Sequence, residues 1–155
     1  MAGYGQALLL DWSAYARVLL ADRSSRGRTL PQRAVGRFAA AVSAGEIWTC
    51  APFRLEASYF VTAPDPYQEL RQELAALPSA EADADTWARA EQAQAELILT
   101  RGVSHRVKLA DLLVAAIADQ HTLGVLHYDH DYDVISVHTS LTFDSVWIAE
   151  RGAID

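Results

Sequence analysis

Hydrophobic residues follow two different patterns along this chain. Several stretches repeat an apolar residue every three or four positions, which is the spacing of a helix with one buried face. Between them lie short runs that are almost entirely apolar, as in strands covered on both sides. The predicted helices cover residues 14–21, 32–44, 52–61, 67–77, 82–100, 108–119 and 132–137. The predicted strands are QALLLD (6–11), EIWTC (46–50), GVLHYD (124–129) and SVWIA (145–149).

Short apolar strands that alternate with helices indicate an α/β fold with a mainly parallel sheet. We expect a small sheet of four or five strands wrapped by about seven helices, formed by a single domain over residues 1–155. Ser13 is expected to cap the first helix, and the APDP segment (63–66) should separate the third helix from the fourth.

The helix KLADLLVAAIAD (108–119) contains a carboxylate where the apolar pattern predicts a buried face. Five apolar residues recur there at three- and four-residue spacing: Leu109, Leu112, Leu113, Ala116 and Ile117. Asp111 lies among them, one turn from the start. A charge beside a core face is costly unless something compensates it. The positive end of the helix dipole could do so, contributing about 0.3–1 kcal/mol.

Three further acids are expected at the same edge of the sheet. Asp11 and Asp129 each follow a predicted strand, and ligands of open parallel sheets bind beyond the carboxyl ends of the strands. Helices run antiparallel to the strands they connect, so the starts of the helices that carry Asp111 and Glu56 should reach that edge as well. Each acid alone could be a helix cap, but four at one edge favour a shared role.

Close carboxylates repel one another by about 4 kcal/mol at a separation of about 4 Å and an effective dielectric near 20. Lys108 and Arg54 are the only nearby bases within these motifs, and the directions of their side chains cannot be predicted. The remaining solutions are raised pKa values or a bound divalent cation. Oxygen ligands suit Mg²⁺ or Mn²⁺, which serve phosphoryl chemistry.

The net charge of −7 by itself argues against nucleic-acid binding, unless the basic residues are concentrated in one place. They are concentrated in DRSSRGRTLPQRAVGR (22–37), the best candidate for phosphate contacts. A solvated helix face or a docking arm is an equal alternative. The candidate RNA-binding residues are Arg23, Arg26, Arg28 and Arg33. No signal peptide or membrane-length apolar run is visible, so a cytoplasmic location is expected.

Other reactive or metal-binding side chains give weaker signals. Cys50 has no neighbour in IWTCAPF that would lower its pKa, and therefore resembles a small hydrophobic residue. His127, His130 and His138 lie near Asp129 in the sequence, but their spacing matches no structural zinc motif. We expect His127 to pack beside its strand.

Four motifs in this order, LLLDWSAY, APFRLEASYF, KLADLLVAAIAD and VLHYDHDYDVI, resemble those of the PIN-domain ribonucleases. The likeness is greatest to the VapC toxins of bacterial toxin–antitoxin pairs, and it covers nearly the whole chain. It implies a PIN-like fold in which magnesium or manganese activates a water that cuts RNA, with tRNA and rRNA as plausible targets. It also implies a cognate VapB-type antitoxin that covers the acidic groove, and a homodimer.

The resemblance also implies a role for each acid of the predicted edge. Asp11 matches the first metal-binding acid, Glu56 the second, and Asp111 the third. Ser13 matches a hydroxyl residue that positions the first acid or a water on the metal.

The match is less regular at the fourth acid. Family members usually show Thr-x-Asp where this chain has His127-Tyr128-Asp129, which puts one local hydrogen bond in doubt. Asp129 matches the fourth acid, although Asp131 follows closely and could share its role.

Two alternatives to a ribonuclease stay open from the residues alone. A magnesium-dependent phosphatase on a related sheet would favour a second Asp two positions after Asp11, where this chain has Ser13. An inactive PIN-like binding module would not need all four acids, and all four are present.

Overall fold

The computed structural model describes residues 1–21, 29–100, 102 and 106–154. Over these residues it contains four strands and seven helices, as the sequence pattern predicts. The strands are β1 (Leu8–Leu10), β2 (Ile47–Trp48), β3 (Gly124–His127) and β4 (Ser145–Trp147). The helices are α1 (Trp12–Ala21), α2 (Gln32–Ser43), α3 (Ala51–Tyr59), α4 (Pro64–Ala75), α5 (Ala84–Leu99), α6 (Leu109–Gln120) and α7 (Asp131–His138).

The strands form one parallel sheet in the order β2-β1-β3-β4. Leu10 of β1 is in register with Leu126 of β3, and the next residue, Asp11, donates its N–H to the carbonyl of Leu126 over 3.0 Å. Residues that follow β1 and β3 therefore start from the same edge of the sheet. The α/β fold predicted from the hydrophobic pattern is confirmed.

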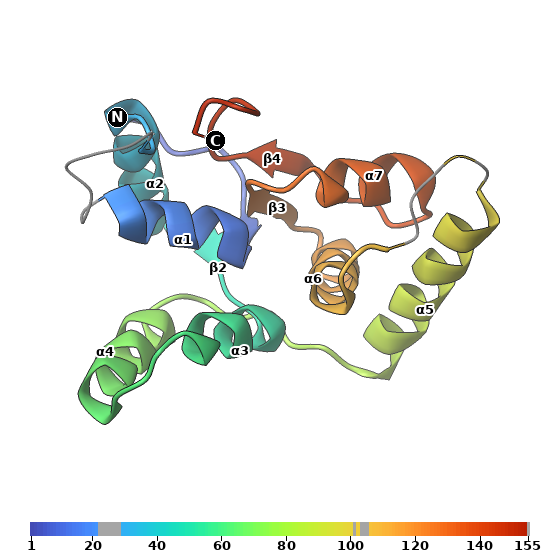
Figure 1. Cartoon of the computed structure of the whole chain (residues 1–155), viewed down its shortest axis with the longest axis horizontal. Helices are drawn as coiled ribbons and strands as arrows, with labels where there is room; N and C mark the ends of the chain where they lie inside the picture. The colour runs from blue at the N-terminus through green and yellow to red at the C-terminus, as the bar shows by residue number, and fades with distance from the viewer. Residues whose placement is uncertain (22–28, 101, 103–105, 155) are drawn as a thin grey trace.

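The core forms where helices cover this sheet on both sides. All residues of β1 and β3 are buried, which explains why these strands are continuous apolar runs. Helix α6 packs against β1 and β3, and α5 covers α6 on its outer side (Figure 1). Residues 114–118 of α6 are completely buried, because neighbours surround this helix on several faces. Leu109, which the helical spacing assigned to the buried face, is 70% exposed at the first position of the helix.

Some helix ends differ from the predictions. Helix α1 begins at Trp12, so Ser13 lies inside the helix and does not cap it. The carbonyl of Asp11 accepts the N–H groups of Ala14 and Tyr15, and its carboxylate accepts that of Ser13 over 2.8 Å. Helix α4 begins at Pro64, three residues before the predicted start at residue 67. The prolines of the APDP segment do not prevent this, since proline is well tolerated in the first turn of a helix.

Helices α3 and α4 lie together on one side of the molecule and α5 on the other (Figure 1). Among the described residues, no helix is both long enough and apolar enough to cross a membrane.

Candidate metal centre

The acidic residues predicted to converge do approach one another beyond the carboxyl ends of β1 and β3. Asp11 follows β1, and Asp129 follows β3 after one intervening residue. Asp111 lies in the first turn of α6, and Asp131 opens α7. The parallel sheet brings these elements to one edge, which explains why residues more than 100 positions apart form one site.

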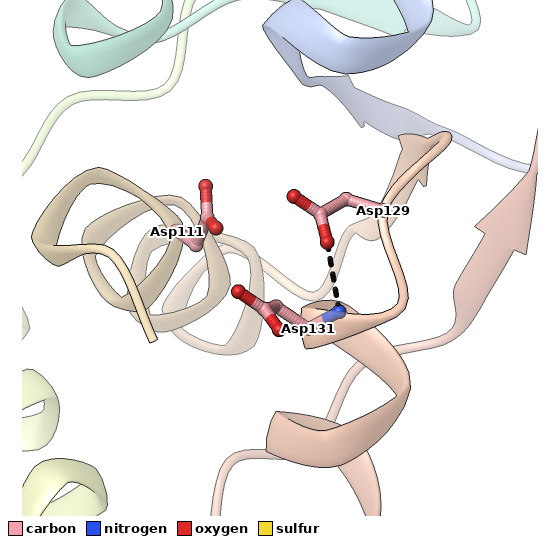
Figure 2. A group of neighbouring side chains, drawn as sticks. All are labelled: Asp111, Asp129 and Asp131. Carbon is pink, nitrogen blue, oxygen red and sulfur yellow. Dashed lines mark hydrogen bonds between the residues drawn. The ribbon is translucent and has the colours of Figure 1, made fainter. Parts of the chain in front are cut away.

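Three carboxylates form the centre of the site. Asp111, Asp129 and Asp131 each place an oxygen within 4.8 Å of the others. Figure 2 shows these side chains pointing toward a common space from α6, from the segment after β3 and from α7. The N–H of Asp131 donates to Oδ1 of Asp129 over 3.0 Å, which fixes the turn between the two acids. Asp129 and Asp131 therefore both lie in the site, and the geometry fits either of them as the fourth acid.

Asp11 lies outside this group of three but is tied to it by a buried tyrosine. The hydroxyl of Tyr132 donates to Oδ1 of Asp11 over 2.6 Å and lies 3.4 Å from Oδ1 of Asp111. Ser13 donates through its hydroxyl to Oδ2 of Asp11 and accepts the N–H of Tyr128 over 2.9 Å. Asp11 is thus held by hydrogen bonds on both oxygens.

Tyr132 is a residue of the site that the sequence pattern does not identify. It lies inside the acid-rich run DHDYDV, and the helical spacing of α7 predicts only a core residue there. Burial, followed by the charges of Asp11 and Asp111, raises the pKa of Tyr132 well above its usual value. The hydroxyl therefore stays protonated and acts as a donor between the two acids.

Glu56 and Lys108 lie at the margin of the site. Glu56 is half-buried on α3, and burial, followed by the charge of Asp11, raises its pKa. Lys108, the only lysine in the sequence, places Nζ 3.9 Å from Oδ2 of Asp129. Arg54 lies elsewhere, donating to Thr49 and Ser79. Lys108 is thus a basic side chain beside the acids, although its own side chain is 67% exposed.

Asp111 is the least compensated acid of the site. Its Oδ2 is buried and has no hydrogen-bond partner in the part of the chain that the structure describes. Burial, followed by the charges of Asp11 and Asp129, raises the pKa of Asp111 to about 8. The helix dipole alone therefore does not account for this residue, because a satisfied capping carboxylate has a lowered pKa.

A divalent cation fits this arrangement. Hard cations such as Mg²⁺ and Mn²⁺ take carboxylate oxygens as ligands, and they remove the repulsion that raises the pKa values of Asp111 and Asp131. Oδ2 of Asp111 can serve as a ligand atom, because no group within the described parts of the chain donates a hydrogen bond to it.

His127 occupies the position at which family members usually have a threonine. Its Nδ1 accepts the N–H of Asp129 over 3.1 Å, so the local hydrogen bond survives the loss of the usual threonine. Burial lowers the pKa of His127 to about 4, against the raising effect of Asp133 and Asp11. As predicted, His127 is buried beside its strand.

The remaining candidates lie away from the acids or outside the described residues. Arg23, Arg26 and Arg28 fall outside them. Arg33 is exposed on α2 and lines a cleft of about 780 Å³ next to Trp147. Cys50 is buried, and burial raises its pKa to about 12, in keeping with an unreactive thiol.

Comparisons with known proteins agree with this geometry. The model of the PIN domain family matches residues 10–137. Ribonuclease VapC18 of Mycobacterium tuberculosis (strain ATCC 25618 / H37Rv) is 36% identical over 138 residues, which cover 88% of this chain and 99% of the relative. Ribonuclease VapC51 of the same strain is 37% identical over 101 residues, covering 65% of this chain and 71% of the relative.

Solved structures show the same fold at low sequence identity. The crystal structure of DNA-bound VapBC from Salmonella typhimurium matches with a TM-score of 0.67 at 15% identity, over 93% of this chain and 99% of that chain. VapBC2 from Rickettsia felis, bound to a DNA fragment from its promoter, matches with a TM-score of 0.61 at 12% identity, over 95% of this chain and 99% of that chain.

Proposed function

The chain belongs to the PIN-domain family, and from this premise we propose that it is a metal-dependent endoribonuclease, the VapC-type toxin of a toxin–antitoxin pair. The observation that carries the proposal is the group of Asp111, Asp129 and Asp131, in which a buried Asp111 oxygen has no hydrogen-bond partner among the described residues. Identity of 36% to a protein named as a ribonuclease, over nearly the full length of both chains, supports the reaction class.

The proposed cofactor is Mg²⁺ or Mn²⁺, held by Asp111 and Asp129 with Asp131 beside them. Asp11 and Glu56 complete the acidic set, as the resemblance implies. When bound, such an ion lowers the pKa of water and stabilises charge on a phosphodiester. Asp11 is the most rigidly oriented acid, since Ser13 and Tyr132 each donate to one of its oxygens.

Other residues of the chain can accept a proton or contact the phosphates of the substrate. Glu56 is half-buried with a raised pKa, which makes it a stronger base than an exposed glutamate and suits a group that accepts a proton from an attacking water. Lys108 is exposed beside Asp129, where it can contact a substrate phosphate once the acids are neutralised. Arg23, Arg26, Arg28 and Arg33 are the proposed contacts to more distant phosphates, with tRNA or rRNA as the substrate class.

We further propose that a VapB-type antitoxin is the partner and that the toxin forms a homodimer. The structures of similar fold include VapBC complexes. A cleft of about 580 Å³ between α1, α3 and α4 supplies a surface for such a partner. It is lined by apolar side chains that include Leu20 and Phe60, which are 58% and 60% exposed.

Cleavage of total cellular RNA by the purified protein tests the reaction. Without antitoxin, and with Mg²⁺ or Mn²⁺, we expect discrete fragments that disappear when EDTA is added. Asp111→Asn should abolish them and keep the fold. Asp65→Asn is the matched control, because Asp65 also lies in the first turn of a helix but is exposed on α4.

The outcomes separate the alternatives. Cleavage that survives EDTA and Asp111→Asn would overturn the metal site. Release of inorganic phosphate from small phosphoesters, with RNA intact, would favour the phosphatase. Absence of Mn²⁺ binding in a folded protein that still binds antitoxin would favour the inactive binding module.

A further inference from the structure

A second polar network lies directly behind the acidic group, and its residues His127 and Asp133 each lie two positions from an acid of that group. His127, the last residue of β3, is fully buried. On one side its Nδ1 accepts the N–H of Asp129. On the other side its Nε2 lies 2.7 Å from Oγ of Ser145, the first residue of β4. The imidazole therefore connects the backbone of a metal-site acid to the neighbouring strand.

Only one assignment of donors and acceptors is consistent with the contacts of this network. Because Nδ1 of His127 accepts a backbone N–H, a neutral ring carries its proton on Nε2. Nε2–H then donates to Oγ of Ser145, and the Ser145 hydroxyl donates to Oδ1 of Asp133 over 2.6 Å. Asp133 also accepts the indole N–H of Trp147, at 3.1 Å from Oδ2. The network thus ends on an ionised carboxylate that is satisfied on both oxygens.

Packing holds the imidazole in this orientation. The ring of Tyr132 lies 4.9 Å from that of His127, and the ring of Trp147 lies 5.0 Å away on an edge-to-face approach. Tyr132 is the same residue whose hydroxyl reaches Asp11 and Asp111. Movement of the imidazole would therefore disturb both the backbone of Asp129 and the donor shared by the other two acids.

We propose that His127, Ser145 and Asp133 form a positioning chain that fixes the Asp129 backbone and thereby sets the affinity of the acidic group for a divalent cation. This inference rests on the metal binding assumed in the proposed function, but it does not depend on the substrate or the reaction. None of the three residues is assigned as a ligand. Groups behind the ligands of a metal site commonly change metal affinity by about 10–100-fold when they are removed.

Ser145→Ala tests the middle link of the chain, between His127 and Asp133. We expect Mn²⁺ affinity, measured by titration calorimetry or electron paramagnetic resonance, to fall about tenfold, since the imidazole loses its outer anchor. Ser140→Ala is the matched control. Ser140 also donates its hydroxyl to a carboxylate, that of Glu96 over 2.7 Å, but it does so away from the site. Its Mn²⁺ affinity should equal that of the wild type.

A pair of substitutions at His127 separates the two ends of the imidazole. In His127→Asn, the amide oxygen can replace Nδ1 as the acceptor for Asp129. In His127→Gln, the amide nitrogen can replace Nε2 as the donor to Ser145, but the Asp129 N–H loses its acceptor. Both variants lose buried ring volume, so both should be less stable. Mn²⁺ affinity should fall further in His127→Gln than in His127→Asn.

Nitrogen-15 spectra of the metal-free wild type give an independent signature, a proton on Nε2 and none on Nδ1 of His127. A proton on Nδ1, or unchanged Mn²⁺ affinity in folded Ser145→Ala, would overturn the positioning chain. If the His127 variants do not fold, Ser145→Ala decides alone. Wild-type protein that binds no Mn²⁺ overturns both proposals. Wild-type protein that binds Mn²⁺ but leaves RNA intact contradicts only the reaction.

Discussion

Asp131 and Asp133 lie two residues apart in the first turn of α7, yet their surroundings are opposite. Asp133 is held by donors from Ser145 and Trp147. Although burial raises its pKa, these hydrogen bonds lower it below the usual value. Asp131 faces Asp129 and Asp111, and burial followed by the charge of Asp129 raises its pKa.

The difference shows that position at a helix start does not decide what a carboxylate does. Both residues meet the same helix dipole, so the dipole cannot explain pKa shifts of opposite sign. What differs is whether protein donors or other carboxylates face the side chain. An acid satisfied by donors supports the structure, whereas acids that face one another need a proton or a cation.

The largest expected effect follows from removing the least compensated acid. Asp111→Asn should weaken Mn²⁺ binding by at least about 100-fold, because even residues behind metal ligands contribute about 10–100-fold. Asp133→Asn should have a much smaller effect, since the amide oxygen can still accept one of its two donors. Titration calorimetry measures both. Equal losses of Mn²⁺ affinity in the two variants would contradict the conclusion that Asp111 faces the cation and Asp133 does not.

Stability without metal should change in opposite directions for the two acids of α7. Asp133→Asn should lower the free energy of unfolding by about 1–3 kcal/mol, because one partly buried donor loses its charged acceptor. Asp131→Asn should raise it by less than about 1 kcal/mol, since the repulsion is partly screened by solvent. Urea unfolding in EDTA gives both values. Destabilisation by Asp131→Asn would show that protein donors, not carboxylates, dominate around it.

The pH dependence of stability should report Asp111. Its pKa is about 8 in the folded protein against a reference value of 3.8, so the folded state holds the proton more tightly. The stability from this group is fully present below pH 3.8 and is lost as the pH rises through about 8. In EDTA the free energy of unfolding should therefore fall across this window, by up to about 1.4 kcal/mol per pH unit for one proton.

Two controls identify the group responsible for that slope. Asp111→Asn should flatten it, because no proton is exchanged at this position. Saturating Mn²⁺ should oppose it, since the cation binds the deprotonated carboxylate. Urea unfolding of the wild type that is independent of pH across this window would contradict the raised pKa.

The smallest expected effect concerns the single lysine. Lys108 lowers the pKa values of Asp111 and Glu56, but its side chain is largely exposed. Lys108→Met should therefore raise Mn²⁺ affinity by less than about fivefold, because it removes a competing but well-solvated charge. Arg71→Met, which removes a positive charge from the exposed face of α4, should leave the affinity unchanged. A large loss of affinity in Lys108→Met would show that the ammonium organises the acids instead of competing for them.

The fold class and the edge at which the acids meet follow from the order of residues along the chain. Continuous apolar runs and helical spacing predict parallel strands covered by helices, and the parallel arrangement sends Asp11, Asp111 and Asp129 to the same end. These conclusions need only periodicity and chain direction. Helix ends depend on local hydrogen bonds: α1 starts two residues earlier than predicted, because Asp11 accepts the N–H groups of Ser13, Ala14 and Tyr15.

How each acid is compensated depends instead on contacts between distant parts of the chain. The partners of Tyr132 and His127 lie up to 121 positions away, and no local pattern specifies where those side chains point. The run DHDYD looks uniform in sequence, yet Asp131 joins the acidic group and Asp133 joins Ser145. Hydrogen-bond partners depend on side-chain direction and on packing between distant elements, whereas the backbone pattern depends mainly on the residues close by.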